Sequence, residues 1–447
     1  MNNHYICKAS NSIPHLTMTA IVGILNKKAA VMAADSALTV TRGDKTRIYN
    51  NTTKIFKLSD KYPAAVMTFS KAEFMGVPLG VLINMYREQE GDKGFKDLQG
   101  YVDNFIQFLD KERNLHDEKL QHSYLRGEMV TYYEKVQAWA EDEIKEELEA
   151  IQDHEVTVEE RLAIVKKHYL EAINAIIEVV KENKRIPRLE RYSFKKFCEY
   201  AEKDIDDLMD LGKEEGVPED LRENWEKGIY EYICSDFFYN GTGLVFVGYG
   251  TDEIYPSLLT IYISGIFDGN FRYSYSETEN EIISNEHESA IVPFAQCDVM
   301  LTVMKGVSPS LQEKYDEMHQ DTIDKTKSKM VEAMKEAGID EETIAKVQEI
   351  ETKEISEKYT EEIQEFIHTE YINGLVDTVE TFGIEDMANM AESLIEITNL
   401  QRHITASDES VGGPVDVAVL TRDRGFVWMK HHDWAPSGVD VDFRKKL

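Results

Sequence analysis

Three side chains near the start of this 447-residue sequence have the chemistry to hydrolyse an amide bond. Thr19 directly follows Met18, Asp35 lies sixteen positions further on, and Lys54 follows two more threonines. A threonine hydroxyl is a poor nucleophile near neutral pH unless a base lies beside it. The α-amine of the same residue, with a pKa of about 8, can be that base when the threonine begins the chain. The pattern predicts a nucleophile at Thr19, freed either by translation from Met18 or by a cut after it.

Short apolar runs separated by turn-forming residues surround these positions and must place them. We expect strands at "TAIVGIL", "AAVMAAD", "TKIFKL" and "AAVMTFS", which together span residues 19 to 70. Further strands are expected at "GLVFVGYG", "LLTIYISGIF", "VDVAVLT" and "GFVWMKH", between residues 243 and 431. Hairpins rather than β–α–β units connect these runs, which predicts antiparallel sheets in an α+β sandwich.

Charged helices separate the groups of strands. "TVEE" at 157–160 has the form of a capping box, and Ser308 followed by Pro309 suits the start of another helix. Near the end of the chain, apolar residues share one face of a predicted helix that precedes a glycine turn: Met387, Met390, Ala391, Leu394 and Ile395. The sequence therefore predicts long acidic helices attached to a layered core.

The opening and closing segments resemble one known family. Thr19 with "AIVGI", "AAVMAAD" ending in Asp35, and "TTKIFKL" with Lys54 look like the start of proteasome-type β-subunits, which are N-terminal nucleophile (Ntn) hydrolases. "SDESVGGPVDVAVLTRDRGFVWM" is similar to the end of the same family. The closest resemblance is to the bacterial Anbu and heat-shock-locus protease group. Two separate matches in the right order are more specific than either alone.

The resemblance implies a four-layer αββα fold and a role for each matching residue. Thr19 would be the nucleophile and its amine the base, while Asp35 would hold Lys54 in an ion pair near the Thr19 oxygen. Asp408 matches the late aspartate that supports the amine, and Gly412 and Gly413 match the closing glycine pair. A backbone N–H near Phe69 would bind the oxyanion. Phe69 and Ser70 stand where the family has two glycines, and a positive φ would be strained at Phe69.

The resemblance also divides the chain. Residues 1–18 would be a propeptide or a wrongly assigned start. The Ntn core would comprise residues 19–90, 236–306 and 376–435. Two helical insertions would occupy residues 91–235 and 307–375, and a tail would follow at 436–447. Extra residues between Asp35 and Lys54, compared with the family, predict a loop that bulges outward. Subunits of this family assemble into rings or spirals, so a homo-oligomer is expected. The sequence does not show whether an unfoldase is a partner.

Composition narrows the partners and the location. The chain has 83 acidic and 50 basic residues, a formal charge of −33, which disfavours nucleic acids and anionic membrane surfaces. Four scattered cysteines and the lack of an apolar leader or membrane span predict a cytoplasmic protein with free thiols. No cofactor and no metal site are expected. His431 and His432 are neighbours on a predicted strand, so they should point to opposite faces, which is poor for joint metal ligation.

The pattern favours a threonine-type hydrolase that cleaves peptide bonds through an acyl-enzyme on Thr19. Two alternatives remain open. The chain would be a non-catalytic scaffold or shell subunit if Thr19 stays inside the mature chain. It would be an amidohydrolase of small molecules if a closed pocket replaces an extended substrate cleft. Whether the mature chain retains residues 1–18 distinguishes the scaffold from the hydrolase. The size of the substrate distinguishes the small-molecule amidohydrolase from the peptidase.

Overall fold

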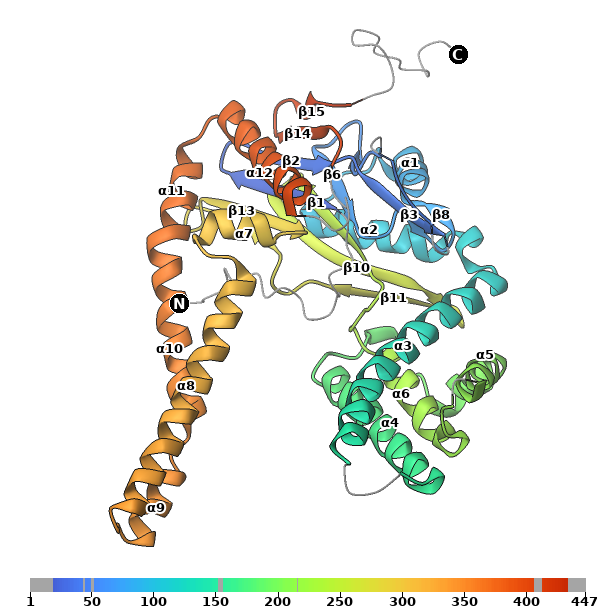
Figure 1. Ribbon diagram of the computed structural model, residues 1–447. Coiled ribbons are helices and arrows are strands. Elements are labelled where there is room, and N and C mark those ends of the chain that lie inside the picture. Colours follow the sequence, from blue (N-terminus) through green and yellow to red (C-terminus); the bar gives the residue numbers. More distant parts are fainter. Residues whose placement is uncertain are drawn as a thin grey trace.

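Two antiparallel sheets form the centre of the protein, with helices outside them (Figure 1). The computed structural model describes residues 19–42, 45–49, 52–151, 156–214, 216–405 and 412–432. The fold is of the mixed α+β type, as the order of strands and helices predicts. No helix in these ranges is both long and apolar enough to cross a lipid bilayer.

The five-stranded sheet brings both ends of the described chain together. Its order is β13 (Ser289–Ala295), β1 (Ala20–Asn26), β2 (Ala30–Asp35), β14 (Val415–Thr421) and β15 (Gly425–Lys430), and every neighbouring pair is antiparallel. In the register, Ala20 lies opposite Ala295, and Asp35 lies opposite Val415. β1 is therefore held on one side by β2, which begins ten positions after the start of β1, and on the other side by β13, which comes more than 200 positions later.

The six-stranded sheet is built from the middle of the chain and one early hairpin. Its order is β11 (Asn270–Tyr275), β10 (Ser257–Phe267), β9 (Thr242–Gly248), β6 (Ala64–Phe69) and β5 (Ile55–Lys57), and β12 (Glu281–Ile282) also pairs with β10. A separate small sheet pairs β7 (Glu73–Phe74) with β8 (Val77–Pro78). All eight strand segments predicted from the sequence are present.

A further hairpin accounts for the extra residues between Asp35 and Lys54. β3 (Leu38–Arg42) pairs with β4 (Lys45–Tyr49) and joins neither large sheet. The Thr52 N–H donates to the Ser36 carbonyl oxygen at 3.0 Å, which closes the base of this excursion. The chain therefore returns to the start of β5 with Lys54 close to the end of β2.

Apolar side chains fill the space between the sheets and beneath the helices. The inter-sheet core joins residues of both sheets, among them Ile21, Met32, Met67, Val245 and Leu258. The outer face of the five-stranded sheet is covered by α7 (Asp298–Lys305), α11 (Asn373–Thr381) and α12 (Ile384–Thr405), and that of the six-stranded sheet by α1 (Leu79–Glu90) and α2 (Leu98–Lys111). The apolar face predicted near the end of the chain is the face of α12 that packs on its sheet.

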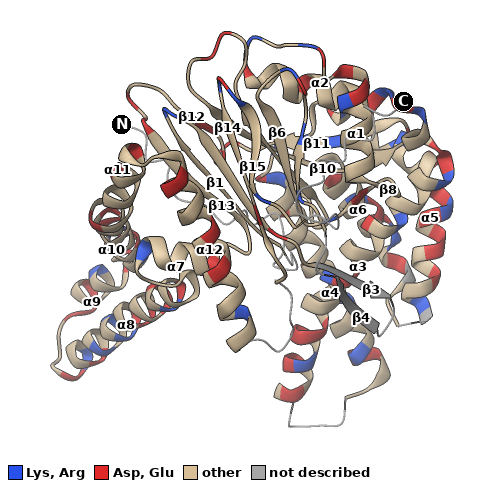
Figure 2. Ribbon diagram, turned by 90° about the horizontal axis from the view of Figure 1, so that it is seen from above, with Lys and Arg blue, Asp and Glu red and all other residues tan. Residues whose placement is uncertain are grey.

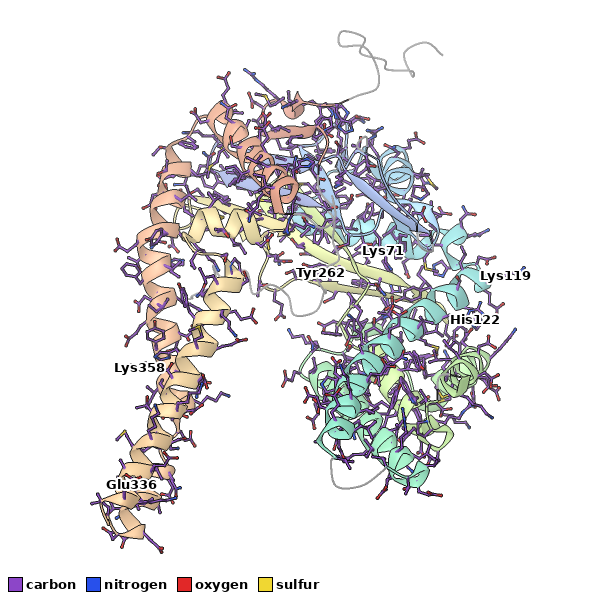
Figure 3. All side chains as sticks on the ribbon, in the orientation of Figure 1. Lys71, Lys119, His122, Tyr262, Glu336 and Lys358 are labelled. Carbon is purple, nitrogen blue, oxygen red and sulfur yellow. The ribbon has the colours of Figure 1, made fainter. Side chains whose placement is uncertain are left out.

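Two helical parts extend from this core (Figure 1). The first contains η1 (Arg113–His116), α3 (Glu118–Ala150), α4 (Val158–Lys181), η2 (Pro187–Leu189), α5 (Phe194–Glu214), η3 (Glu219–Leu221) and α6 (Arg222–Cys234). The second is a projecting hairpin of α8 (Pro309–Glu336), α9 (Glu341–Gln348) and α10 (Thr352–Ile367), which a π-helical turn, η4 (His368–Ile372), joins to α11. Glu336 and Lys358 lie on this hairpin, far from Lys119 and His122 on α3 (Figure 3).

The two helical parts differ in how they are stabilised. The first has its own core around the buried Trp225, whereas α8 buries a single residue, Val331, within its described length. Both begin their helices as the sequence predicts: Thr157 and Glu160 form a reciprocal capping box, and the Ser308 hydroxyl accepts the Leu311 N–H. Charged residues are spread over these helices, while the strands consist mostly of uncharged residues (Figure 2).

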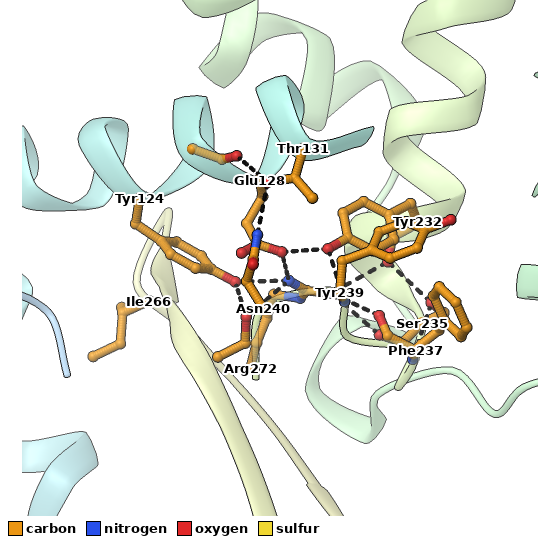
Figure 4. A network of polar contacts seen from close by, with 12 residues as sticks. Tyr124, Glu128, Thr131, Tyr232, Ser235, Phe237, Tyr239, Asn240, Ile266 and Arg272 are labelled. Atoms are coloured by element: carbon orange, nitrogen blue, oxygen red, sulfur yellow. Dashed lines mark hydrogen bonds and ion pairs between the residues drawn. The ribbon is translucent and has the colours of Figure 1, made fainter. Parts of the chain in front are cut away.

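A buried polar network joins the first helical part to the six-stranded sheet (Figure 4). Arg272 of β11 is fully buried and donates from Nη1 to the Tyr124 hydroxyl at 2.6 Å and to Glu128 Oε2 at 3.3 Å, both on α3. The Tyr232 hydroxyl of α6 also donates to Glu128. This network fixes two helices of the insertion against one strand.

Candidate active site

Thr19 immediately precedes β1 and is buried at the end of the five-stranded sheet. Its carbonyl oxygen accepts the Gln296 N–H at 3.0 Å, from the residue after β13. The next N–H, of Ala20, donates to Asp35 Oδ1 at 2.9 Å. The backbone on the carbonyl side of Thr19 is therefore held by both neighbouring strands.

Asp35 ends β2 and collects four donors on its two oxygens. Oδ1 accepts the Lys54 ammonium at 2.7 Å as well as the Ala20 N–H. Oδ2 accepts the N–H groups of Ala37 at 3.2 Å and Gly412 at 3.5 Å. A carboxylate with this many donors is locked in position, which makes it suited to orienting a lysine rather than to reacting itself.

The Asp35 and Lys54 side chains form an ion pair with almost no access to water. Lys54 lies just before β5, and its carbonyl oxygen accepts the Thr68 N–H at 2.9 Å, which anchors it to β6. Burial lowers the pKa of Lys54, against the opposing charges of Asp35 and Asp416. Burial likewise raises the pKa of Asp35, against the effect of Lys54. The Asp35 charge and hydrogen bond favour the protonated form of Lys54, in opposition to its burial.

The glycine pair reaches the same place from the far end of the sequence. Gly412 donates to Asp35, and Gly413 has φ of 77°, a left-handed conformation that suits glycine. The Ser36 hydroxyl donates to the Pro414 carbonyl oxygen at 2.8 Å. Asp408, the expected partner of the Thr19 amine, lies outside the described residues.

In the turn after β6 the positive φ falls on Ser70 and not on Phe69, where it would have been strained. Phe69 is a strand residue opposite Gly243, and the left-handed conformation falls on the next residue, Ser70, with φ of 75°. The Ser70 hydroxyl oxygen is buried and has no hydrogen-bond partner among the described residues. Ala295, opposite Ala20, also has a left-handed φ of 62°. Strained non-glycine residues concentrate at functional sites, and here one directly flanks Thr19.

The Phe69 ring occupies the space that a side chain at position 243 would need. It packs between Phe294 and Tyr262, with ring centroids 5.7 Å and 6.0 Å away, and Tyr262 is labelled in Figure 3. A Cβ atom at Gly243 would overlap this ring. Phe69 and Gly243 therefore fix the β6 end of the site as a complementary pair.

We expect Gly243→Ala to lower the free energy of unfolding by about 1–3 kcal/mol, because the new methyl group displaces the Phe69 ring. Chemical denaturation measures this change. Gly127→Ala is the control, because that glycine lies on the exposed face of α3 with open space around it, and alanine there should add about 0.8–1 kcal/mol of stability. Equal effects of the two substitutions would contradict the close packing of Phe69.

One group of potential functional residues was missed by sequence reasoning. His431 and His432 follow the end of β15, so strand alternation does not govern them, and the expectation that they point to opposite faces is wrong. Both rings contact the buried carboxylate of Asp416 in β14. The sequence signals were the two adjacent histidines and Asp416, a charged residue inside the apolar run "VDVAVLT".

A cavity of about 800 Å³ lies elsewhere, between α8, α10 and η4. Carboxylates line much of it, including Glu313, Asp316 and Glu361. None of Thr19, Asp35 and Lys54 belongs to it. Its position at the base of the projecting hairpin separates it from the candidate active site.

No protein-family model matches the sequence, and no curated protein matches it. The functional interpretation therefore depends on the residues and on their geometry.

Proposed function

We propose that this protein is a threonine-type Ntn hydrolase that cleaves amide bonds, most simply those of peptides. The observation that carries the proposal is the buried Asp35–Lys54 ion pair, which is tied to the backbone one residue after Thr19. A buried pair of this kind is costly to form, since both groups lose their hydration. Its place beside a threonine supports a chemical role in addition to a structural one.

In the proposed reaction the Thr19 hydroxyl attacks the substrate carbonyl carbon and passes its proton to the Thr19 α-amine. The tetrahedral intermediate expels the leaving amine, which takes up that proton, and an ester on Thr19 remains. Water activated by the same α-amine then hydrolyses the ester. The positive charge of Lys54 favours the deprotonated Thr19 oxygen, and a unit charge at roughly 4 Å in an effective dielectric of about 20 contributes about 4 kcal/mol. The backbone N–H groups near Phe69 and Ser70 are the proposed oxyanion donors.

The arrangement of layers supports the same class. Apolar residues of the two sheets meet between them, and helices pack on the outer face of each sheet. This packing supports the αββα sandwich that we propose. The proposed assembly is a cytoplasmic homo-oligomer. The projecting hairpin supports it because large apolar side chains are exposed there, among them Tyr315, Met318, Tyr359 and Phe366.

The decisive test is the N-terminus of the protein made from its native start region. We expect intact mass and N-terminal sequencing to find Thr19 as the first residue, and we expect fluorogenic peptides to be hydrolysed. Thr19→Ala should abolish hydrolysis while circular dichroism shows an unchanged fold. A homogeneous chain that retains residues 1–18 and lacks activity would favour the scaffold alternative. Hydrolysis of small acyl amides but not of peptides would favour the small-molecule amidohydrolase.

A further inference from the structure

Asp416 and two histidines form a cluster beside the candidate active site, next to the position that pairs with Asp35. Asp416 Oδ1 accepts hydrogen bonds from His431 Nδ1 at 3.1 Å and from His432 Nδ1 at 2.7 Å. It also accepts the His432 backbone N–H at 2.9 Å. The three ligand atoms lie within 4.8 Å of one another. Two imidazoles and one carboxylate are a common donor set for zinc and related divalent metals.

We propose that Asp416, His431 and His432 form a binding site for a divalent transition metal such as Zn²⁺. The geometry supports this because tetrahedral Zn²⁺, with bonds of about 2.0–2.1 Å, holds its ligand atoms roughly 3.3 Å apart. The Nδ1 to Oδ1 distances of 3.1 Å and 2.7 Å require only a small outward movement of the rings. A neutral imidazole can offer Nδ1 to a cation while its proton resides on Nε2.

The site is ordered before any metal enters. The Asp416 side chain is 2% exposed and is fixed in β14 opposite Ala34. The His431 ring stacks on Trp428 with centroids 4.0 Å apart and an interplanar angle of 9°. His432 is held by its own backbone N–H. Preorganised ligands lose less conformational entropy on binding, which favours affinity.

The two histidine side chains are partly accessible to solvent. The His431 and His432 side chains are 23% and 10% exposed, so the cluster lies at the edge of the sandwich rather than at its centre. Three protein ligands leave at least one tetrahedral position for water or another donor. The metal would fasten the residues after β15 to β14, one residue along from the position that pairs with Asp35.

The test uses the full chain without a polyhistidine tag, stripped of metal with a chelator and titrated with Co²⁺. We expect one Co²⁺ per chain, with the strong visible absorption of a four-coordinate ion, and its displacement by Zn²⁺. Elemental analysis after desalting gives the stoichiometry. His431→Ala and His432→Ala should each weaken Co²⁺ binding at least about tenfold, while circular dichroism shows that both variants are folded.

His287→Ala is the matched control. His287 contacts the Glu281 carboxylate at 2.7 Å and belongs to no group of three potential metal ligands in the part of the chain that the structure describes, so its loss should leave the stoichiometry and affinity for Co²⁺ unchanged. The proposal is overturned if the folded wild-type chain binds no Co²⁺ or Zn²⁺ stoichiometrically. It is equally overturned if the His432→Ala variant binds as tightly as the wild type. Neither result depends on hydrolytic activity, so failure here is distinct from failure of the proposed hydrolase function.

Discussion

Replacing Lys54 with methionine is expected to lower the free energy of unfolding by about 3–5 kcal/mol, because the buried Asp35 carboxylate loses its counter-charge. If the proposed function is right, hydrolysis should also fall by about a thousandfold, the kinetic equivalent of the roughly 4 kcal/mol assigned to the lysine charge. Urea denaturation and peptide hydrolysis below the unfolding transition measure the two effects separately.

A double variant separates stability from chemistry at this pair. Asp35→Asn combined with Lys54→Met removes both charges, so it should recover part of the lost stability without recovering activity. Lys61→Met is the control, because Lys61 and Asp92 form an exposed pair and its loss should cost less than about 1 kcal/mol. Full activity in the double variant would show that Lys54 is only structural. A Lys54→Met variant as stable as the wild type would contradict the burial of the pair.

Breaking the buried network of Figure 4 should be equally costly. Glu128→Ala leaves the fully buried guanidinium of Arg272 without its carboxylate partner and is expected to destabilise the protein by about 3–5 kcal/mol. Since the network joins α3 and α6 to β11, the loss should first appear as faster amide hydrogen exchange in these three elements. Hydrogen exchange followed by mass spectrometry measures the location, and denaturation measures the size.

Two comparisons test the origin of this effect. Glu277→Ala removes the partner of Lys184 in an exposed pair, where a change within about 1 kcal/mol is expected. Glu128→Met combined with Arg272→Met replaces both charges with apolar groups and should be more stable than Glu128→Ala. If the double variant were less stable, hydrogen bonds from Arg272 to the carbonyl oxygens of Tyr232, Ser235 and Phe237 would be the dominant contribution.

The strands and the helix starts could be predicted from the sequence because both depend on neighbouring residues. Alternating and continuous apolar runs identified the segments that became β1, β2, β6, β9 and β14. The capping box at Thr157 and the Ser308 cap satisfy N–H groups only three residues away. Such local hydrogen bonds leave a direct signature in the order of amino acids.

The small β3–β4 hairpin and the position of the strain at Ser70 were not predictable in the same way. Leu38–Arg42 pairs with Lys45–Tyr49, and these two strands join no other sheet of the described residues, whereas the sequence indicated no more than a loop that bulges outward. The left-handed φ at Ser70 depends on how β6 ends against its neighbours, while Phe69 keeps its strand conformation because its ring is held against Phe294 and Tyr262. Packing between distant residues decides both.

The sequence by itself determined which residue types are available at the candidate site: a threonine, an aspartate and a lysine at the ends of predicted strands, and a glycine pair near the end of the chain. Only the tertiary structure decided which of them meet. It brings Gly412 to Asp35 across more than 370 residues, and it turns His431 and His432 onto the same carboxylate after β15 has ended. Local periodicity cannot encode such contacts, because they arise from the register of the five-stranded sheet and the packing that holds it.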